Sequence, residues 1–329
     1  MTENLLEVHG LRTEYRSDGR RFTAVDGIDF TVGPGEILGL VGESGSGKSA
    51  TLRSILGLIK PPGRVEGRIL WRGRDIHGLA PSALQRVRGA EIAMIFQDPM
   101  TALNPVLTVG QQIRESLAAH TDLSASDRQR RAIELLDLVG IPAAASRLDD
   151  YPYQFSGGIR QRAMIAIALA AKPALLLADE PTTALDVTIQ DQIIKLIQRL
   201  AAELRMSVIL VTHDLGVVAE SCDRVAVMYA GRIVETAPVA TLFRSPRHAY
   251  TLGLLQSMPV GRSPRTPLPF IPGAPPRPGD SLNGCAFAAR CAFVGDECRH
   301  GRPETRHVGL DHMTLCRRAE ALPAALEPA

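Results

Sequence analysis

Four short runs of apolar residues stand out along the chain, and each ends in a distinctive polar stretch. Continuous runs of this length predict strands that are buried on both faces, as in a mostly parallel sheet covered by helices. Ligands of such sheets bind beyond the carboxyl ends of the strands, so we expect the polar endings to form one site. The runs and their endings are ILGLV (37–41) before GESGSGKS, EIAMIF (91–96) before Gln97, ALLLA (174–178) before Asp179 and Glu180, and SVILV (207–211) before Thr212 and His213.

Helical patterns separate these runs. Apolar residues recur at every third or fourth position in ATLRSILGLI (50–59) and in TIQDQIIKLIQRLAAEL (188–204), which predicts amphipathic helices. Between Gln97 and Ser156, the segments VGQQIRESLAAH and DRQRRAIELLDLVGI predict further helices with no buried strand among them. The pattern therefore predicts an α/β fold with a helical insertion. After about residue 240 the strand pattern ends, and residues 259–280 hold eight prolines in 22 residues, which predicts a stiff, extended linker.

The composition is that of a folded soluble protein, with 45% hydrophobic and 22% charged residues among 329. The formal net charge is only +2, which is too small to attract a polyanion such as nucleic acid strongly. We therefore expect no nucleic-acid partner. No run reaches the roughly 18 apolar residues of a membrane span, and the start MTENLLEVHG does not look like a signal peptide. We therefore expect a cytosolic protein that reaches a membrane only through another protein, and whose five cysteines form no disulfides.

The first polar ending, GESGSGKS (42–49), matches the phosphate-loop pattern G-x-x-x-x-G-K-[ST] between a predicted strand and a predicted helix. Backbone N–H groups at the glycines would wrap a triphosphate, Lys48 would bridge the β- and γ-phosphates, and Ser49 would ligate Mg²⁺. A glycine-rich turn without a ligand is the alternative, and the flanking elements disfavour it. The predicted ATP-binding residues of this loop are Gly42, Ser44, Gly45, Ser46, Gly47, Lys48, Ser49 and Ala50.

Two adjacent carboxylates follow the third run. Neighbouring strand residues point in opposite directions, so Asp179 suits the Mg²⁺ shell and Glu180 suits the general base that orients an attacking water. A solvated acidic strand end is the alternative. Gln97 and His213 are candidates by their positions at strand ends, and Tyr15 is a candidate platform for an adenine ring, with a core role as its alternative.

The stretch FSGGIRQR (155–162) places two glycines at the start of a predicted helix. Glycine permits a close approach to the backbone, and a helix N-terminus carries unpaired N–H groups and partial positive charge. We therefore expect an anion to bind at Ser156, Gly157 and Gly158.

Taken in order, GESGSGKS, Gln97, FSGGIRQR, LLLADEP, TALD (183–186) and VTHD (211–214) resemble the motifs of ATP-binding cassette ATPases over roughly residues 5–240. The resemblance implies a dimer in which each ATP lies between the phosphate loop of one cassette and the signature of the other. The anion at the signature would then be the γ-phosphate of ATP held by the partner. The resemblance also assigns Gln97 to the Q-loop and the Mg²⁺ shell, His213 to the γ-phosphate contact, Asp186 to the D-loop and Tyr15 to the A-loop.

The implied fold is an α/β, RecA-like P-loop NTPase with a mostly parallel sheet, a helical subdomain insertion and a small cysteine-containing C-terminal extension. The expected parts are a core in 1–97 and 157–240, a helical signature subdomain in 98–156, a helix and proline-rich linker in 241–281, and a cysteine-rich extension in 282–329.

Longer stretches, such as MIFQDPMTALNPVLTVGQQI and YPYQFSGGIRQRAMIAIALA, resemble the D-type ATPase of bacterial dipeptide and oligopeptide importers. Ile159 departs from the Gln of many cassettes, and D-type subunits usually carry an apolar residue there. The resemblance implies ATP-driven peptide uptake at the cytoplasmic face of the inner membrane, with import of nickel or a glutathione-like solute as the alternative. Implied partners are an F-type ATPase paralogue in a heterodimer, two membrane-spanning permeases and an extracytoplasmic solute-binding protein.

Four cysteines cluster in the tail, at C-x5-C-x6-C-x17-C, while Cys222 stands apart. Structural zinc sites usually use tighter pairs, so four thiolates could instead hold a [4Fe–4S] cluster, as the family resemblance also suggests. Zn²⁺ is the rival ligand, and four unrelated thiols are the remaining alternative. His300, His307 and His312 could be spare ligands, but we expect them to be surface residues. The four clustered cysteines are Cys285, Cys291, Cys298 and Cys316.

Two other classes of function deserve comparison. A soluble cassette ATPase acting on nucleic acid or ribosomes often carries two cassettes or a long coiled coil, whereas Ser49 and Ser156 are only 107 residues apart here and there is one cassette. A regulatory protein that binds ATP without hydrolysing it would not need Glu180 and His213.

Overall fold

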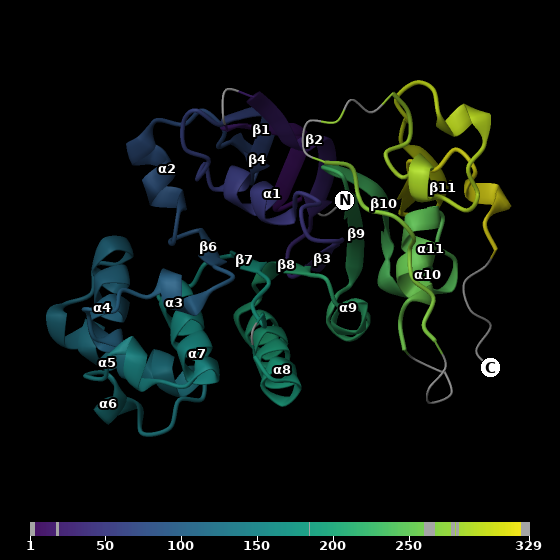
Figure 1. Cartoon of the computed structure of the whole chain (residues 1–329). Coiled ribbons are helices and arrows are strands. Elements are labelled where there is room, and N and C mark those ends of the chain that lie inside the picture. Colours follow the sequence, from purple (N-terminus) through teal and green to yellow (C-terminus); the bar gives the residue numbers. More distant parts are fainter. Residues whose placement is uncertain are drawn as a thin grey trace. The chain divides into compact units, whose positions relative to one another are not determined.

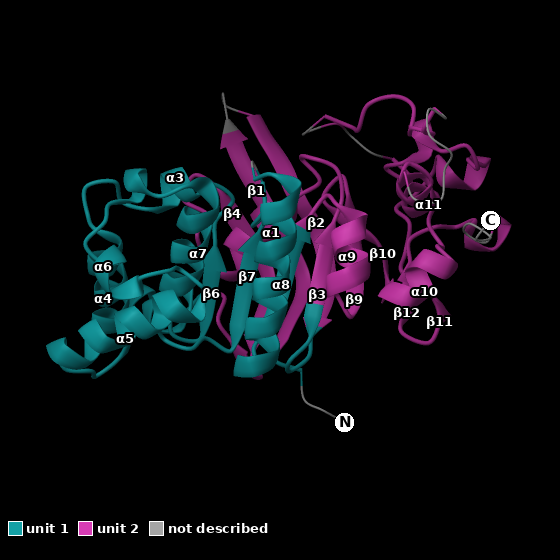
Figure 2. Cartoon of the chain, turned by 90° about the horizontal axis from the view of Figure 1, so that it is seen from below, with its two compact units in different colours: residues 1–5, 32–37, 78–211 teal, residues 6–31, 38–77, 212–329 magenta. Residues whose placement is uncertain are grey.

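The computed structural model divides the chain into two compact units, which Figure 2 colours separately. Unit 1 comprises residues 1–5, 32–37 and 78–211, and unit 2 comprises residues 6–31, 38–77 and 212–329. The structure describes residues 4–17, 20–183, 185–259, 267–277, 280 and 283–323.

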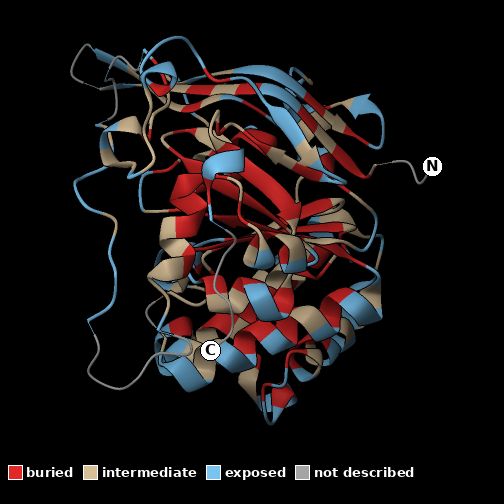
Figure 3. Cartoon of the chain, turned by 90° about the vertical axis from the view of Figure 1, so that its right-hand side faces the viewer, coloured by how far each residue is buried: buried red, intermediate tan, exposed pale blue. Residues whose placement is uncertain are grey.

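Unit 1 is built on parallel strands. The middle strand, β7 (Leu175–Asp179), pairs on one side with β6 (Ile92–Ile95) and on the other with β8 (Ser207–Thr212), whose last residue is counted with unit 2. Every residue of β7 and β8 is buried, which confirms the prediction of strands covered on both faces. Figure 3 shows buried residues both in strands and along parts of the helices.

Between Gln97 and Ser156, where every residue is described, unit 1 contains helices and no strand, as predicted. Helices α3, α4, α5 and α7 pack on one another (Figure 1). Thr108 begins α4 with a capping box, in which its side chain accepts a hydrogen bond from the backbone N–H of Gln111 and the Gln111 side chain accepts one from Thr108 N. The helices of unit 1 are α2 (Pro81–Val87), α3 (Pro99–Ala102), α4 (Val109–His120), α5 (Ala125–Leu138), α6 (Ala144–Arg147), the 3₁₀ turn η1 (Pro152–Gln154), α7 (Gly157–Ala168) and α8 (Val187–Leu204).

Unit 2 contains a sheet in the order β2-β1-β4-β5, in which β4 runs antiparallel to both β1 and β5. A second set of strands has the order β11-β12-β10-β9-β3. In the second set β3 runs parallel to β9, and the remaining pairs are antiparallel. The strands are β1 (Leu6–Ser17), β2 (Arg20–Val32), β3 (Ile37–Val41), β4 (Arg64–Trp71), β5 (Arg74–Asp75), β9 (Arg224–Tyr229), β10 (Arg232–Pro238), β11 (Arg306–Gly309) and β12 (His312–Thr314).

The helices of unit 2 include one that is shorter than its sequence predicts. Apolar periodicity extends through Ile59, but the helix after the phosphate loop ends at Ile55, because Gly57 takes a positive φ of 59°. The helices are α1 (Lys48–Ile55), α9 (Leu215–Ser221), α10 (Val239–Arg244) and α11 (Ala249–Gln256), with 3₁₀ turns η2 (Ala288–Arg290), η3 (Asp296–Cys298) and η4 (Ala319–Ala321).

The tail adds strands to the sheet of unit 2. β12 pairs with β10 through Glu235 opposite Thr314 and Thr236 opposite Met313, and β11 pairs with β12. The expectation that no strand follows residue 240 was therefore wrong. Strands of four and three residues are too short to show a periodic pattern in the sequence.

A buried carboxylate ties the tail to this sheet. Glu235 Oε1 lies 2.8 Å from His312 Nε2, and Oε2 accepts a 2.9 Å hydrogen bond from the backbone N–H of His248. The expectation that His312 lies on the surface was wrong, since the residue is 3% exposed and satisfies Glu235. Burial lowers the pKa of His248 to about 4, so its imidazole is neutral at neutral pH.

The predicted proline-rich linker is only partly described. Its residues 260–266, 278–279 and 281–282 lie outside the described residues, and residues 267–277 contain no helix or strand. Ile271 packs against Gly253 of α11, where an added Cβ would lie 2.9 Å from the Ile271 side chain. No helix in the described part of the chain is long and apolar enough to cross a membrane.

We predict that His312→Ala lowers the free energy of unfolding by about 2 kcal/mol, because it leaves the buried Glu235 carboxylate without one of its hydrogen-bonding partners. Urea unfolding followed by circular dichroism measures this change. His307→Ala is the matched control, since His307 is an exposed histidine of β11 and should shift stability by less than about 0.5 kcal/mol. Equal effects of the two substitutions would contradict the role given to His312.

Candidate functional site

The phosphate loop of unit 2 is shaped by glycines in positive-φ conformations. Gly42, Gly45 and Gly47 have φ values of 152°, 79° and 108°. A Cβ at Gly42 would lie 2.1 Å from the carbonyl oxygen of Met228, and one at Gly47 would lie 2.4 Å from that of Ala24. The backbone angle favours glycine at all three positions, and at Gly42 and Gly47 the neighbouring strands also leave no room for a side chain.

Lys48 spans this loop. Its side chain is largely buried, and Nζ donates hydrogen bonds to the carbonyl oxygens of Gly42 at 2.7 Å and Glu43 at 3.0 Å. The Ser46 hydroxyl is buried in the same loop and forms no hydrogen bond with any residue in the described part of the chain. Helix α1 has no acidic residue in its first turn, so its N-terminus presents partial positive charge to the loop. These features suit a phosphate group.

Tyr15 of β1 stacks on Phe22 of β2, with ring centroids 5.6 Å apart and an interplanar angle of 21°. Burial raises the pKa of Tyr15, while the charge of Arg53 acts in the opposite direction. Ala24, two residues along β2 from Phe22, approaches Gly47 of the phosphate loop. The aromatic pair is therefore linked to the loop by a single strand.

His213 is an exposed residue between β8 and α9. The neighbouring Asp214 is held by both its backbone and its side chain. Its N–H donates to the Thr212 hydroxyl at 3.0 Å. Its carboxylate caps α9 and accepts a hydrogen bond from Gly216 N at 2.7 Å. The cap holds the backbone beside His213 in place.

In unit 1, strand register brings Gln97 and Glu180 together. Ile95 pairs with Ala178 in parallel strands, so the residues two positions beyond each are also neighbours. Gln97 Nε2 donates a hydrogen bond to Glu180 Oε2 at 3.2 Å. The expectation that polar endings of neighbouring strands meet is confirmed for this pair.

Glu180 is held in an unusual backbone conformation. Its φ of 45° is rare for a residue with a side chain, and its N–H donates to Val211 O at 3.1 Å. The Thr183 hydroxyl donates to the same Oε2 as Gln97, at 2.9 Å. Asp179, by contrast, is completely buried. The adjacent carboxylates thus occupy different surroundings, as the alternation of a strand predicts.

The glycines of the FSGGIRQR stretch have a packing role that the sequence did not reveal. An added Cβ would lie 3.2 Å from Leu185 at Gly157 and 2.8 Å from Ile189 at Gly158. Ser156 caps α7, and its Oγ accepts from Ile159 N at 3.4 Å. Ser156 and Gly157 are nevertheless exposed, so they remain accessible to another molecule.

Asp186 caps α8 and accepts a hydrogen bond from Ile189 N at 3.0 Å. The D-loop motif and the signature therefore meet at Ile189, which contacts Gly158. Ala184 of the TALD motif lies outside the described residues.

The four tail cysteines line one small cavity of about 20 Å³, together with Phe287. All five cysteines of the chain are free thiols. Burial raises the pKa of Cys285, Cys291 and Cys316. Within the described ranges, no three His, Cys, Asp or Glu side chains form a group that could hold a metal ion. Cys222 lies elsewhere, against Gly39 of β3, and burial raises its pKa to about 12.

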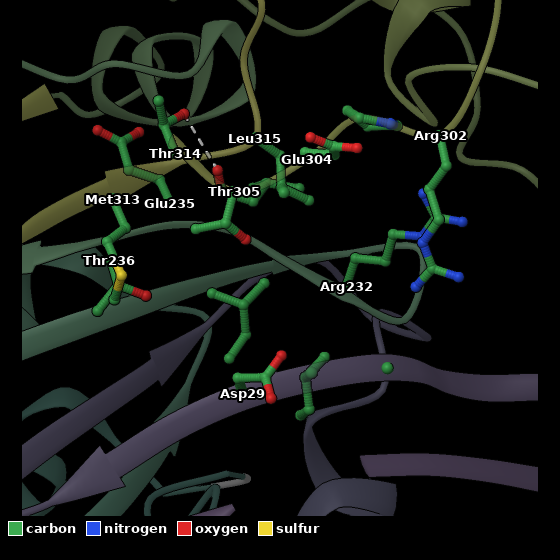
Figure 4. Close-up of a pocket in the computed structure, with 15 residues that line it drawn as sticks. Asp29, Arg232, Glu235, Thr236, Arg302, Glu304, Thr305, Met313, Thr314 and Leu315 are labelled. Atoms are coloured by element: carbon green, nitrogen blue, oxygen red, sulfur yellow. Dashed lines mark hydrogen bonds between the residues drawn. The ribbon is translucent and has the colours of Figure 1, made fainter. Parts of the chain in front are cut away.

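A larger cavity of about 360 Å³ lies between β2, β10 and the tail (Figure 4). Arg232 and Arg302 point toward the same end of it, where their guanidinium groups approach Asp26 at 2.7 Å and 3.5 Å. None of the residues predicted to bind ATP lines this cavity.

The structure also reveals a contact that sequence reasoning missed. Arg290 of the tail forms an ion pair with Glu43, a variable position of the phosphate-loop motif. The motif specifies only the glycines, the lysine and the serine, so the sequence contained no signal for Glu43 or its partner.

Comparison with protein families shows two matches along the chain. Residues 25–183 match the ABC transporter family. Residues 234–298 match the C-terminal region of oligopeptide and dipeptide transporters.

Curated relatives cover nearly the whole chain. A putative peptide import ATP-binding protein of Brucella abortus (strain 2308) is 52% identical over 303 residues, which are 92% of this chain and 91% of that protein. Another, from Brucella melitensis biotype 1, is 48% identical over 333 residues, which are 97% and 98% of the two chains.

Solved structures show the same fold. The dimeric ATP-binding cassette MJ0796, in a post-hydrolysis state with ADP and phosphate, is 29% identical and covers 71% of this chain and 98% of its own, with a TM-score of 0.64. CbiO1 from Clostridium perfringens, part of an ABC transporter complex, is 29% identical and covers 73% and 91%, with a TM-score of 0.62. The predicted α/β P-loop NTPase fold is confirmed. Its motifs, its C-terminal region and its relatives together show that the chain belongs to the peptide import ATP-binding proteins of the ABC transporter family.

Proposed function

We propose that this chain is the ATP-hydrolysing subunit of a bacterial importer that takes up dipeptides or oligopeptides. Relatives named as peptide import ATP-binding proteins, about half identical over nearly the full chain, carry the proposal. The match of residues 234–298 to the C-terminal region of oligopeptide and dipeptide transporters supports the same substrate class.

In the proposed reaction, the glycine-rich loop and Lys48 hold the phosphates of ATP, and Tyr15 stacks on the adenine. Ser49, Gln97 and Asp179 would bind Mg²⁺, which neutralises charge on the phosphates. Glu180 accepts the proton of the attacking water while the bond from the γ-phosphorus to the ADP oxygen breaks, and His213 contacts the γ-phosphate.

The surroundings of Glu180 support its role as base. Gln97 and Thr183 both donate to Oε2, at 3.2 Å and 2.9 Å, and so fix the rotation of the carboxylate. A water molecule bound to a carboxylate of fixed orientation is itself oriented, and most catalysis of phosphoryl transfer comes from such positioning and charge stabilisation.

A second cassette would complete each site through its signature and D-loop. Ser156 and Gly157 are exposed at the start of α7, a 12-residue helix with no acidic residue in its first turn, which supports binding of a partner's γ-phosphate together with Gly158 and Asp186. We infer an F-type paralogue as the partner in a heterodimer.

The helical insertion carries exposed apolar side chains that support docking to a membrane protein. Met100, Val106 and Tyr153 are 56%, 75% and 65% exposed. We infer that two permeases bind here, at the cytoplasmic face of the inner membrane, and that an extracytoplasmic binding protein delivers the solute. Closure of the cassettes would then move the insertion and the attached permease.

Other substrates and classes remain alternatives to test. A nickel or glutathione-like solute would use the same ATP chemistry, but the names of the relatives favour peptides. A soluble cassette ATPase acting on ribosomes or nucleic acid is the rival from another class, and the transporter-specific C-terminal region argues against it.

We also infer that the tail cysteines hold a [4Fe–4S] cluster, with Zn²⁺ as the alternative. Thiolates are the donors that such clusters use, and all four cysteines line one cavity, although among the described residues no three of them are grouped closely enough to hold a metal ion in this conformation. The cavity, at about 20 Å³, has room for little more than one water molecule. Binding of a [4Fe–4S] cluster would therefore require the cysteine loops to move apart. A cluster in this position would have a structural role.

We predict that Glu180→Gln retains ATP binding but lowers turnover by at least about 100-fold, because the water loses its base. Titration with a fluorescent ATP analogue and phosphate release from the assembled complex measure the two quantities. Glu203→Gln is the control, since Glu203 is a half-exposed carboxylate of α8 that forms an ion pair with Arg199 of the same helix. Near-normal hydrolysis by Glu180→Gln would overturn the proposed function.

We predict that Ser156→Asp leaves ATP binding by the isolated chain intact but prevents the ATP-dependent dimer. Aspartate retains the helix cap that Ser156 provides, so the substitution separates capping from phosphate binding, and its charge repels the γ-phosphate of the partner. Light scattering of the chain mixed with its F-type partner, with and without ATP, detects the dimer. Ser126→Asp, at the exposed start of α5, is the matched control and should still dimerise. A normal dimer of Ser156→Asp would refute the role given to the signature.

We predict that anaerobically purified protein contains about four irons and four sulfides per chain, and that Cys291→Ser removes them. Metal and sulfide analysis with a visible spectrum measures this. One zinc and no iron would favour the alternative, and neither metal would refute both.

A further inference from the structure

We propose that the cysteine-containing tail fixes the conformation and charge of the phosphate loop, with Arg290 as a positioning residue that acts through Glu43. The inference rests on the proposed function in one respect, namely that this loop binds ATP. Arg290 does not touch the nucleotide in this account. Its effect is exerted on the loop residue next to Gly42.

The contact between Arg290 and Glu43 is bidentate. Arg290 Nη1 donates to Glu43 Oε2 at 2.9 Å, and Nη2 donates to Oε1 at 3.2 Å. The side chain of Arg290 is 7% exposed and that of Glu43 is 27% exposed. A two-point ion pair shielded from water is more directional and less screened than a surface pair.

Arg290 is itself held from several sides. Its Nε donates to Pro272 O at 2.9 Å, and Nη2 also donates to Ile271 O at 3.3 Å. The guanidinium lies over the rings of Tyr229 and Phe287, at 5.8 Å and 5.9 Å from their centroids. Because these contacts fix the position of the guanidinium, it can determine the orientation of the Glu43 side chain.

A second residue beyond the cassette core holds the backbone of Glu43. The Tyr250 hydroxyl accepts a hydrogen bond from Glu43 N at 2.9 Å. Tyr250 belongs to α11 and is completely buried against Tyr229 and Phe287. Burial raises the pKa of Tyr250, so the phenol keeps its proton at neutral pH.

The backbone of Glu43 contacts two groups that would bind phosphate, the Lys48 side chain and the backbone N–H of Ser46. Its carbonyl oxygen accepts from Lys48 Nζ at 3.0 Å and from Ser46 N at 3.2 Å. The backbone of Glu43 therefore lies between the tail and the lysine of the loop. A shift of Glu43 would move Lys48 and the N–H groups together.

The ion pair also changes the charge of the phosphate loop. A carboxylate in a loop that holds three phosphates repels them, and Arg290 neutralises that carboxylate. Removing Arg290 would leave an uncompensated charge, whereas removing both charges would not. This difference separates an effect exerted through the charge of Glu43 from the loss of a packing contact of Arg290, because a lost packing contact would not be restored by changing Glu43.

The experiment is a double-mutant cycle on the full chain with a fluorescent ATP analogue. We expect Arg290→Ala to raise the dissociation constant about tenfold, and Glu43→Gln to bind at least as tightly as the parent. The double variant should bind within about threefold of the parent. In the assembled importer, Arg290→Ala should raise the KM for ATP and leave kcat unchanged.

Arg306→Ala is the matched control, because Arg306 is a tail arginine whose ion pair with Glu320 is exposed and remote from the loop in sequence. It should bind ATP as the parent does. If Arg290→Ala does not fold, Arg290→Lys keeps the charge but loses the two-point contact, and Glu43→Gln should restore its weakened binding.

Three outcomes would overturn the inference: unchanged ATP affinity in Arg290→Ala, no recovery in the double variant, or the same loss in Arg306→Ala. Failure of the parent chain to bind ATP would instead overturn the proposed function. The two failures are thus distinguishable.

Discussion

The close approach of two strand carbonyls to the phosphate loop is the constraint on which the rest of the site depends. The carbonyl oxygens of Met228 and Ala24 lie where a Cβ of Gly42 or Gly47 would be, so only a glycine-rich loop fits against β9 and β2. In this conformation the Lys48 side chain crosses the loop, and its Nζ donates hydrogen bonds to the carbonyl oxygens of Gly42 and Glu43. The strands thereby determine where a triphosphate can be held, and the motif is a consequence of that packing.

Packing of the tail also constrains the phosphate loop. Phe287 packs edge-on against Tyr229 at 5.3 Å, and β12 lengthens the sheet beside β10. Through Arg290 and Tyr250, this added layer contacts Glu43, one of the loop positions that the motif leaves open. An extension that carries four cysteines is therefore part of the unit that contains the phosphate loop.

Local patterns predicted the four buried strands and the helical insertion, because apolar runs and helical periodicity can be read directly from the sequence. They also predicted that the polar residues after these strands form one site, but not which of them touch, such as Gln97 and Glu180. Contacts across long separations were not predictable. Glu43 and Arg290 are 247 positions apart and neither belongs to a periodic pattern. His312 lies in a strand of three residues and its imidazole contacts Glu235 of β10, so the expectation that it lies on the surface was wrong.

The most direct test of the account is the ATPase rate of the complex purified from membranes, reconstituted in vesicles with its solute-binding protein, with and without a dipeptide. The account predicts two permeases in the complex, hydrolysis that increases when the peptide is present, and peptide accumulation that stops without ATP. Hydrolysis that is indifferent to peptide, or co-purification with ribosomes instead of permeases, would contradict it.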